Sequence, residues 1–91
     1  MLPRQTAEEI SRLLAKEITV KRESLGLSKN ETATRAGLSV SFVSDLENGK
    51  SRASVETLVK LAWVFGTTAS EMLEACERRS GYSPSRGLDQ L

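Results

Sequence analysis

The sequence predicts an all-α fold, namely one compact domain of five helices followed by a flexible C-terminal tail. Apolar residues recur every three or four positions along much of the chain, which is the period of an amphipathic helix. The apolar residues are mainly Leu, Val, Ile and Ala, and the two prolines, Pro3 and Pro84, lie near the ends of the chain. Hydrophobic residues make up 38% of the 91 residues, which is enough for one small core.

The first helix is expected to begin at Thr6 or Ala7 and to end near residue 25. Thr6 and Glu9 have the T-x-x-E spacing of a capping box, which places the start of the helix at Thr6. Gly26 can adopt a positive φ and therefore ends the helix. The apolar stripe of this helix consists of Ile10, Leu13, Leu14, Ile18 and Leu25.

Two short helices with a glycine between them are expected next. Ser28 and Glu31 have the S-x-x-E spacing of a second capping box, and Gly37 stops the helix that they open. Ser39 caps the following helix, which ends at Asn48 and Gly49. The two helices cover residues 29–36 and 40–47.

Two further helices complete the domain. Ser54 caps a helix that runs to Phe65, and Gly66 ends it. Trp63 and Phe65 are expected mainly in the core, with the alternative that one of them extends to a dimer surface. Thr68 and Glu71 form another capping box, which opens a fifth helix that ends at about residue 78. Residues 80–91 are rich in Ser, Gly and Pro without apolar periodicity. We therefore assign residues 1–79 to the domain and residues 80–91 to a flexible tail.

The composition excludes several classes of protein. The chain has no histidine and Cys76 is its only cysteine, so it can form neither an internal disulfide nor a tetrahedral Cys/His zinc site. Cys76 lacks a base partner and no glycine-rich phosphate loop is present, so we expect no enzyme activity, cofactor or metal. No apolar run is long enough for a membrane span, and the N-terminus lacks the apolar segment of a signal peptide, so we expect a cytoplasmic protein.

The charge is nearly balanced but unevenly distributed. Thirteen Lys and Arg against twelve Asp and Glu give a net charge of +1, which is low for a protein that binds nucleic acid. Residues 16–52 carry seven basic and five acidic side chains, a net charge of +2, whereas residues 53–91 carry four and five, a net charge of −1. The central segment is therefore the candidate for contact with an anionic partner.

Residues 28–48 have the layout of a DNA-binding helix-turn-helix, since a helix of about eight residues, a glycine, a short turn and a second short helix follow one another. Ala33 is small where the two helices must approach closely, and Gly37 can adopt the left-handed conformation that redirects the chain. The apolar side chains expected in the angle between the helices are Leu38, Val43 and Leu46.

These landmarks resemble the phage repressor/Cro (xenobiotic-response-element-like) family of helix-turn-helix proteins over about residues 18–73. The matching residues are Leu25 to Ser28, Ala33, Gly37 to Ser39, Val43, Ser44, Leu46 to Lys50, Leu58, Leu61, Ala62 and Gly66. The resemblance implies a five-helix, repressor-like domain, a homodimer, a roughly palindromic operator on double-stranded DNA and a role in transcription. Thr32 departs from the family pattern at a place usually held by leucine, which puts a small polar group against the core or weakens the helix.

The expected DNA contacts come from the two motif helices, their caps and the following loop. Lys29 and the backbone N–H groups at both helix starts are suited to phosphates, and Ser41 and Ser44 to base edges. Phe42 is expected to be half-buried support, and Asp45 either to accept from a cytosine or to hold Lys50 or Arg52. The full set is Ser28, Lys29, Ser39, Val40, Ser41, Phe42, Ser44, Asp45, Asn48, Lys50 and Arg52. No Gln, Asn or Arg occupies the outward positions of the second helix, so DNA shape is expected to contribute to specificity.

The resemblance also implies an internal ion pair between Arg22 and Glu47 and a dimer interface at Phe65, Met72, Leu73 and Cys76. The leading hypothesis is a dimeric transcriptional regulator, and the sequence leaves open whether it is a phage-type repressor, a restriction–modification controller or an antitoxin that regulates its own operon. The alternative is a helix-turn-helix adaptor that binds a toxin or a sigma-type protein in place of DNA.

Overall fold

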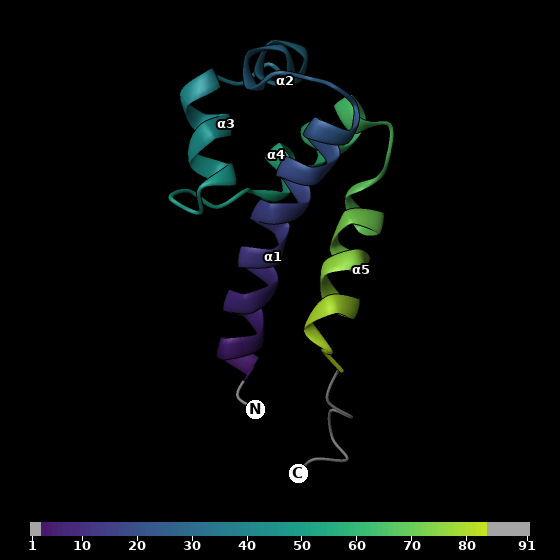
Figure 1. Ribbon diagram of the computed structural model, residues 1–91. Coiled ribbons are helices and arrows are strands. Elements are labelled where there is room, and N and C mark those ends of the chain that lie inside the picture. Colours follow the sequence, from purple (N-terminus) through teal and green to yellow (C-terminus); the bar gives the residue numbers. More distant parts are fainter. Residues whose placement is uncertain (1–2, 84–91) are drawn as a thin grey trace.

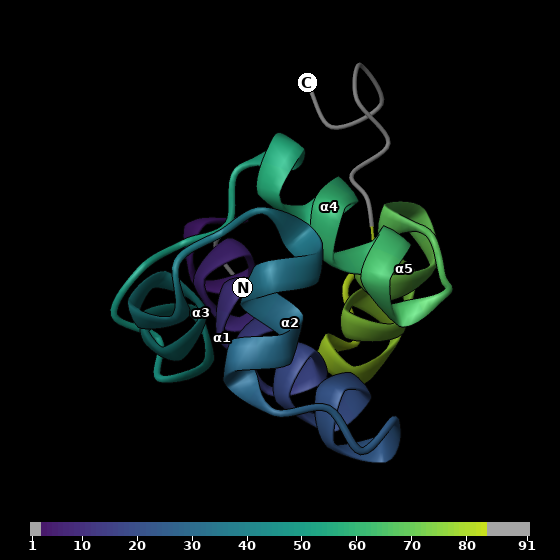
Figure 2. The same ribbon diagram turned by 90° about the horizontal axis from the view of Figure 1, so that it is seen from above.

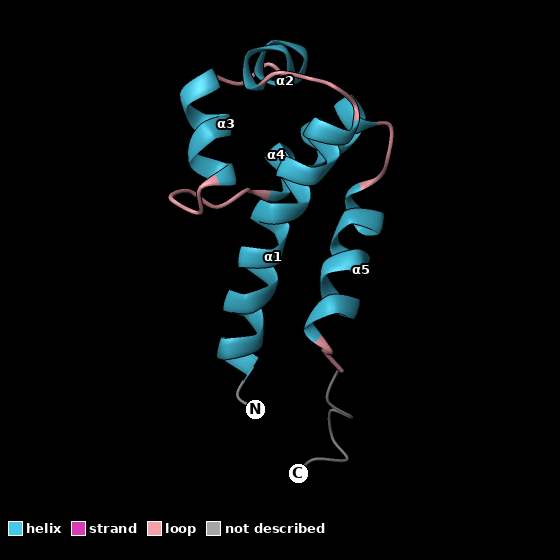
Figure 3. Ribbon diagram, in the orientation of Figure 1, coloured by secondary structure: helices cyan, strands magenta, loops and turns pink. Residues whose placement is uncertain are grey.

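The computed structural model describes residues 3–83, and within them the chain forms five helices and no strand (Figures 1 and 3). This confirms the all-α fold. The helices are α1 (Pro3–Ser24), α2 (Lys29–Ala36), α3 (Val40–Glu47), α4 (Val55–Phe65) and α5 (Ala69–Ser80).

The long helix α1 organises the molecule. It runs antiparallel to α5, while α2, α3 and α4 gather around its C-terminal half (Figure 1). Seen from above, α3 and α5 lie at opposite sides of the molecule, with α2 and α4 between them (Figure 2). The core between these helices consists of Leu14, Ile18, Ala36, Leu46, Leu58, Leu61, Ala62, Phe65, Met72 and Cys76.

The starts of α2, α3, α4 and α5 follow the capping signals of the sequence, although the capping box at α5 is incomplete. At α2 the capping box is complete, because the Glu31 N–H donates to Ser28 Oγ and the Ser28 N–H donates to a Glu31 carboxylate oxygen, both at 2.9 Å. Ser39 and Ser54 cap α3 and α4 as expected. At α5 only half of the box forms: Thr68 Oγ1 accepts from the Glu71 N–H, whereas the Glu71 carboxylate accepts from the Thr67 hydroxyl at 2.8 Å.

The start of the first helix and the end of the last helix differ from those expected. Helix α1 begins at Pro3, since proline is tolerated in the first turn of a helix, so Thr6 is an interior residue and the capping box proposed there is wrong. Leu25 follows the end of α1 and its side chain is 51% exposed, so it does not belong to the buried stripe. Helix α5 continues to Ser80, the first residue of the expected tail. Residues 84–91 of that tail lie outside the described part of the chain.

Helix α4 buries Phe65 as expected, but it leaves Trp63 exposed. Phe65 is buried in the core, but Trp63 is 75% exposed, so its assignment to the core was wrong. Leu58, Leu61 and Phe65 follow one another at spacings of three and four, and this stripe is the buried one. Trp63 lies two positions before Phe65, and residues two apart on a helix point to different faces.

Thr32 places a polar group in the core. Its side chain is fully buried in α2, and its hydroxyl has no hydrogen-bond partner among the described residues. The first of the two expected consequences, a small polar group against the core, is therefore the one that occurs.

Candidate nucleic-acid interface

Helices α2 and α3 pack against each other through small and branched apolar side chains. Ala33, Val43 and Leu46 are 2%, 0% and 2% exposed, and Leu38 packs partly buried against the same core. Gly37, with φ 70°, ends α2 in the left-handed conformation, so the chain turns directly into α3. Because one face of α3 is buried in this way, its opposite face, with Val40 and Ser41, is directed outward.

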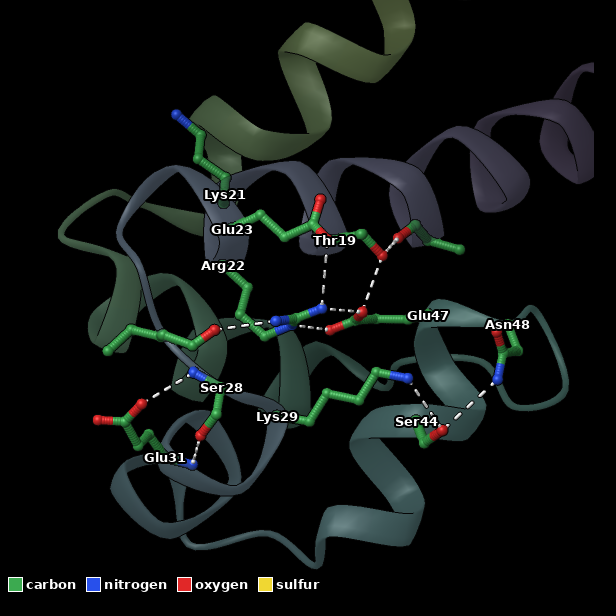
Figure 4. Close-up of polar contacts among 12 residues, drawn as sticks. Thr19, Lys21, Arg22, Glu23, Ser28, Lys29, Glu31, Ser44, Glu47 and Asn48 are labelled. Carbon is green, nitrogen blue, oxygen red and sulfur yellow. Dashed lines mark hydrogen bonds and ion pairs between the residues drawn. The ribbon is translucent and has the colours of Figure 1, made fainter.

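The C-terminal end of α3 is fixed to α1 by a closed polar network (Figure 4). Arg22 Nε donates to Glu47 Oε2 at 2.7 Å and Arg22 Nη2 donates to Glu47 Oε1 at 3.0 Å. The third guanidinium nitrogen, Nη1, donates to the Leu27 carbonyl at 2.9 Å. Thr19 on α1 adds a hydrogen bond to Glu47 Oε1 at 3.0 Å. The structure thus brings together the two residues that the sequence analysis paired, and adds Thr19, which it missed.

Both partners of this ion pair are removed from water. The side chains of Arg22 and Glu47 are 11% and 4% exposed. Burial by itself would raise the pKa of Glu47, but the hydrogen bonds from Arg22 and Thr19 and the charges of Arg22 and Lys29 outweigh it and lower the pKa. The hydrogen bond to Glu47 raises the pKa of Arg22. Both groups are therefore ionised at neutral pH.

Lys29 and Ser44, which the sequence analysis assigned to different tasks, are in contact (Figure 4). Lys29 Nζ donates to Ser44 Oγ at 3.3 Å, and Asn48 Nδ2 approaches the same oxygen at 3.5 Å. The Lys29 charge also contributes to the lowered pKa of Glu47. These three side chains connect the start of α2 to the outer face and the end of α3.

The other residues that were expected to contact DNA differ in exposure and in their interactions. Ser41 and Val40 are exposed, whereas Phe42 is half-buried and packs against the core, as support for the helix. The carboxylate of Asp45 forms no ion pair with Lys50 or Arg52 within residues 3–83, so it does not hold them. The Asp45 carbonyl instead accepts from the backbone N–H groups of residues 50 and 51, at 2.8 and 3.2 Å, and shapes the loop after α3.

The residues expected at a dimer interface lie inside the protomer. Phe65, Met72 and Cys76 are 7%, 1% and 0% exposed and belong to its core, and Leu73 packs partly buried against them. Their side chains are occupied by α1 and α4, because α5 packs along α1 over most of its length. The dimer interface expected at these residues stays a prediction, and Phe65, Met72 and Cys76 expose little side-chain area that could contribute to it.

The structure also reveals basic side chains on α1 that the sequence analysis left out. Arg12 and Lys16 line one wall of a groove of about 470 Å³, and Arg52 in the loop after α3 lines the other. Nothing in the spacing of Arg12 and Lys16 along the chain indicates that they lie near Arg52. The groove runs between α1 and the end of α3, and Glu8 and Glu47 line it together with these three basic residues.

Within residues 3–83 no group of side chains has the composition of a metal site, and no helix combines the length and apolarity of a membrane span.

Comparison with known proteins agrees with this geometry. The helix-turn-helix family matches residues 18–72, which is more than half of the chain and includes α2, α3 and α4. The chain belongs to the helix-turn-helix family. It is 41% identical over 56 residues to the HTH-type transcriptional regulator DdrOP3 of Deinococcus deserti, a match that covers 62% of this chain and 43% of that protein. It is 33% identical over 57 residues to an uncharacterized HTH-type transcriptional regulator of Haemophilus influenzae, covering 63% and 58%.

Solved structures give the same fold. The clp gene regulator ClgR from Corynebacterium glutamicum superposes with a TM-score of 0.73 at 21% identity, over 79% of this chain and 77% of that one. A transcriptional regulator of the same family from Vibrio cholerae superposes with a TM-score of 0.66 at 27% identity, over 77% and 39%. The chain spans about half the length of the curated relatives it matches. The curated relatives are HTH-type transcriptional regulators, and the family is not one of enzymes.

Proposed function

We propose that this protein is a sequence-specific transcriptional regulator that places α3 in the major groove of double-stranded DNA. The observation that carries the proposal is the clamp on α3: the Arg22–Glu47 ion pair holds its C-terminal end while its outward face carries Val40, Ser41 and Ser44. Lys29 and the N–H groups at the starts of α2 and α3 are the groups suited to the phosphates on either side.

The affinity is expected to depend steeply on salt. Contacts from Lys29, Lys50 and Arg52 to phosphates release counterions, so the logarithm of the binding constant falls linearly with the logarithm of the salt concentration. Titration of the full chain with fragmented genomic DNA at several salt concentrations measures this slope. A Lys29→Ala variant should lower the slope by about one unit. Binding that is absent or independent of salt would contradict DNA recognition and favour the adaptor hypothesis, in which a toxin or sigma-type protein occupies the same surface.

We further propose that two copies bind a roughly palindromic operator, as a repressor of phage type, a restriction–modification controller or an antitoxin would. Two recognition helices must lie about 34 Å apart to reach successive major grooves. The surface suited to pairing is the outer face of α4, where Val59 and Trp63 are 53% and 75% exposed. Beside them, Glu56 and Lys60 form an exposed ion pair at 3.2 Å. A two-fold axis brings a surface patch into contact with the same patch of the second copy. Glu56 of each copy can then pair with Lys60 of the other copy.

Trp63 is the only tryptophan and therefore reports on this pairing directly. The apolar patch is small compared with the roughly 800 Å² per partner of a standard interface, so the dimer should be weak in solution and form on DNA. Addition of operator DNA should shift the Trp63 emission to shorter wavelength, and Val59→Asp should remove both the shift and cooperative binding. Val20→Asp, at a position on α1 with a similar exposed fraction of 51%, is the matched control. Unchanged Trp63 emission on a fully occupied operator would contradict this interface.

A further inference from the structure

The two serines on the outward face of α3 differ in their surroundings. Ser41 is exposed and its hydroxyl forms no hydrogen bond within residues 3–83. Ser44, one helical turn later, is half-buried and its oxygen lies between two nitrogen atoms: Lys29 Nζ at 3.3 Å and Asn48 Nδ2 at 3.5 Å (Figure 4). Sequence spacing alone would treat the two hydroxyls as equivalent.

The chemistry of these neighbours restricts what Ser44 can still do. A hydroxyl has two acceptor lone pairs and one donor hydrogen, whereas an ammonium group and an amide nitrogen are donors only. Lys29 and Asn48 therefore both use the acceptor capacity of Ser44. Within the described residues the Ser44 hydroxyl donates to no acceptor, including the carbonyl one turn before it, so its hydrogen remains available.

Lys29 opens α2, and its charge is one of those that lower the pKa of Glu47. The Glu47 carboxylate is fixed by Arg22 and Thr19, and Glu47 follows Ser44 by three positions on α3. The hydrogen bond from Lys29 to Ser44 therefore lies one helical turn from the buried network that fixes α3.

We propose that Lys29 and Asn48 make Ser44 an obligate hydrogen-bond donor, so that it selects a base with an acceptor in the major groove and rejects cytosine. Purine N7, guanine O6 and thymine O4 are such acceptors, whereas the major-groove edge of cytosine offers only its amino group as a donor. This inference rests on the proposed function. It also changes the role of Lys29, which becomes a positioning residue for a base contact in addition to a phosphate contact.

The first experiment selects bound duplexes from a pool with a randomised central segment, using the full chain and its Ser44→Ala, Ser41→Ala and Lys29→Met variants. The position that loses its preference in Ser44→Ala should show guanine, adenine or thymine with the parent, with a loss of discrimination of about fivefold. Lys29→Met should admit cytosine at the same position, because the freed lone pair can accept from the cytosine amino group. Ser41→Ala should affect a different position. Cytosine selected by the parent at the Ser44 position, or a position unchanged by Lys29→Met, would overturn the inference.

The second experiment needs no DNA and separates this inference from the proposed function. In the free protein, Ser44→Ala should shift the ¹⁵N NMR signals of the Lys29 ammonium and the Asn48 side-chain amide, whereas Ser41→Ala should leave both unchanged. Unshifted signals in a variant that melts at the parent temperature would overturn the arrangement at Ser44. Shifted signals together with failure to bind any DNA would overturn the proposed function while leaving the geometry intact.

Discussion

Among the described residues, helix α1 forms one ion pair with α3 and another with α5, and the two pairs differ in distance and burial. Towards α3, Arg22 and Glu47 are both buried and their closest atoms are 2.7 Å apart. Towards α5, the buried Glu17 meets Arg79 at 3.5 Å, and the Arg79 side chain is 52% exposed. The first pair is supported by further hydrogen bonds, from Arg22 to the Leu27 carbonyl and from Thr19 to Glu47, whereas the second is open to water on one side.

The difference follows from how much apolar surface each neighbour can bury. Helix α5 fills the core with Met72 and Cys76, both fully buried, so its position is already determined by packing. Helix α3 has eight residues and only Val43 and Leu46 are buried. It must keep its other face outward, so its orientation depends on a directional polar contact at its end. A helix that presents a functional surface is thus fixed by hydrogen bonds where packing cannot suffice.

The two ion pairs should differ most in the free energy of unfolding that is lost when the arginine of each pair is removed. Arg22→Ala leaves the buried Glu47 carboxylate unpaired and should reduce the free energy of unfolding by about 3–5 kcal/mol. Arg79→Ala should cost about 1 kcal/mol or less, because Arg79 is half in water. Urea unfolding followed by circular dichroism measures both, with Lys21→Ala on the same helix as the background variant. Equal losses for Arg22→Ala and Arg79→Ala would remove the distinction between the two pairs.

Acid should weaken the α3 side of the molecule through Glu47. Its folded pKa lies below its ordinary value of 4.5, so the ion pair contributes its full stability above pH 4.5 and loses it as the pH falls through the folded pKa. The pKa of Arg22 is raised from its ordinary value, so Arg22 does not titrate in this range. Glu47→Gln should be less stable at pH 7 and lose less stability between pH 7 and pH 3 than the parent.

Unfolding in urea at the two pH values measures this dependence. Glu23→Gln is the control, because the Glu23 side chain is 65% exposed and only 3.9 Å from the same arginine. A parent and a Glu47→Gln variant with the same pH dependence would show that the pair contributes nothing through ionisation.

The smallest effect is expected at Thr32, the buried polar group without a partner. Valine has nearly the same shape, and its substitution removes a hydroxyl that folding deprives of water without compensation. Thr32→Val should stabilise the protein by about 1 kcal/mol and raise its melting temperature by about 4–8 °C. Thr34→Val, at an exposed position of the same helix, should change it little. A Thr32→Val variant that is less stable than the parent would show that the buried hydroxyl does not destabilise the fold, although it has no hydrogen-bond partner.

Local signals in the sequence predicted most of the fold. Serine and threonine caps and left-handed glycines act within one turn, so the start of α2, α3, α4 and α5 could be read from a few neighbouring residues. The start of α1 could not, because Thr6 and Glu9 have capping spacing but the chain before them continues the helix. Trp63 was misplaced because an apolar residue on an apolar helix does not disclose which face the neighbouring helices will cover.

By itself the sequence determined the number and order of the helices, the turn between α2 and α3 and the face of α3 that is left outward, since these depend on periodicity and short-range capping. The tertiary structure alone decided which side chains from distant segments meet. It buried Met72 and Cys76 against α1, brought Thr19 to Glu47, and set Lys29 against Ser44, fifteen residues apart. Such contacts depend on how the helices cross, and a crossing is fixed by the summed packing of several helices rather than by any local pattern.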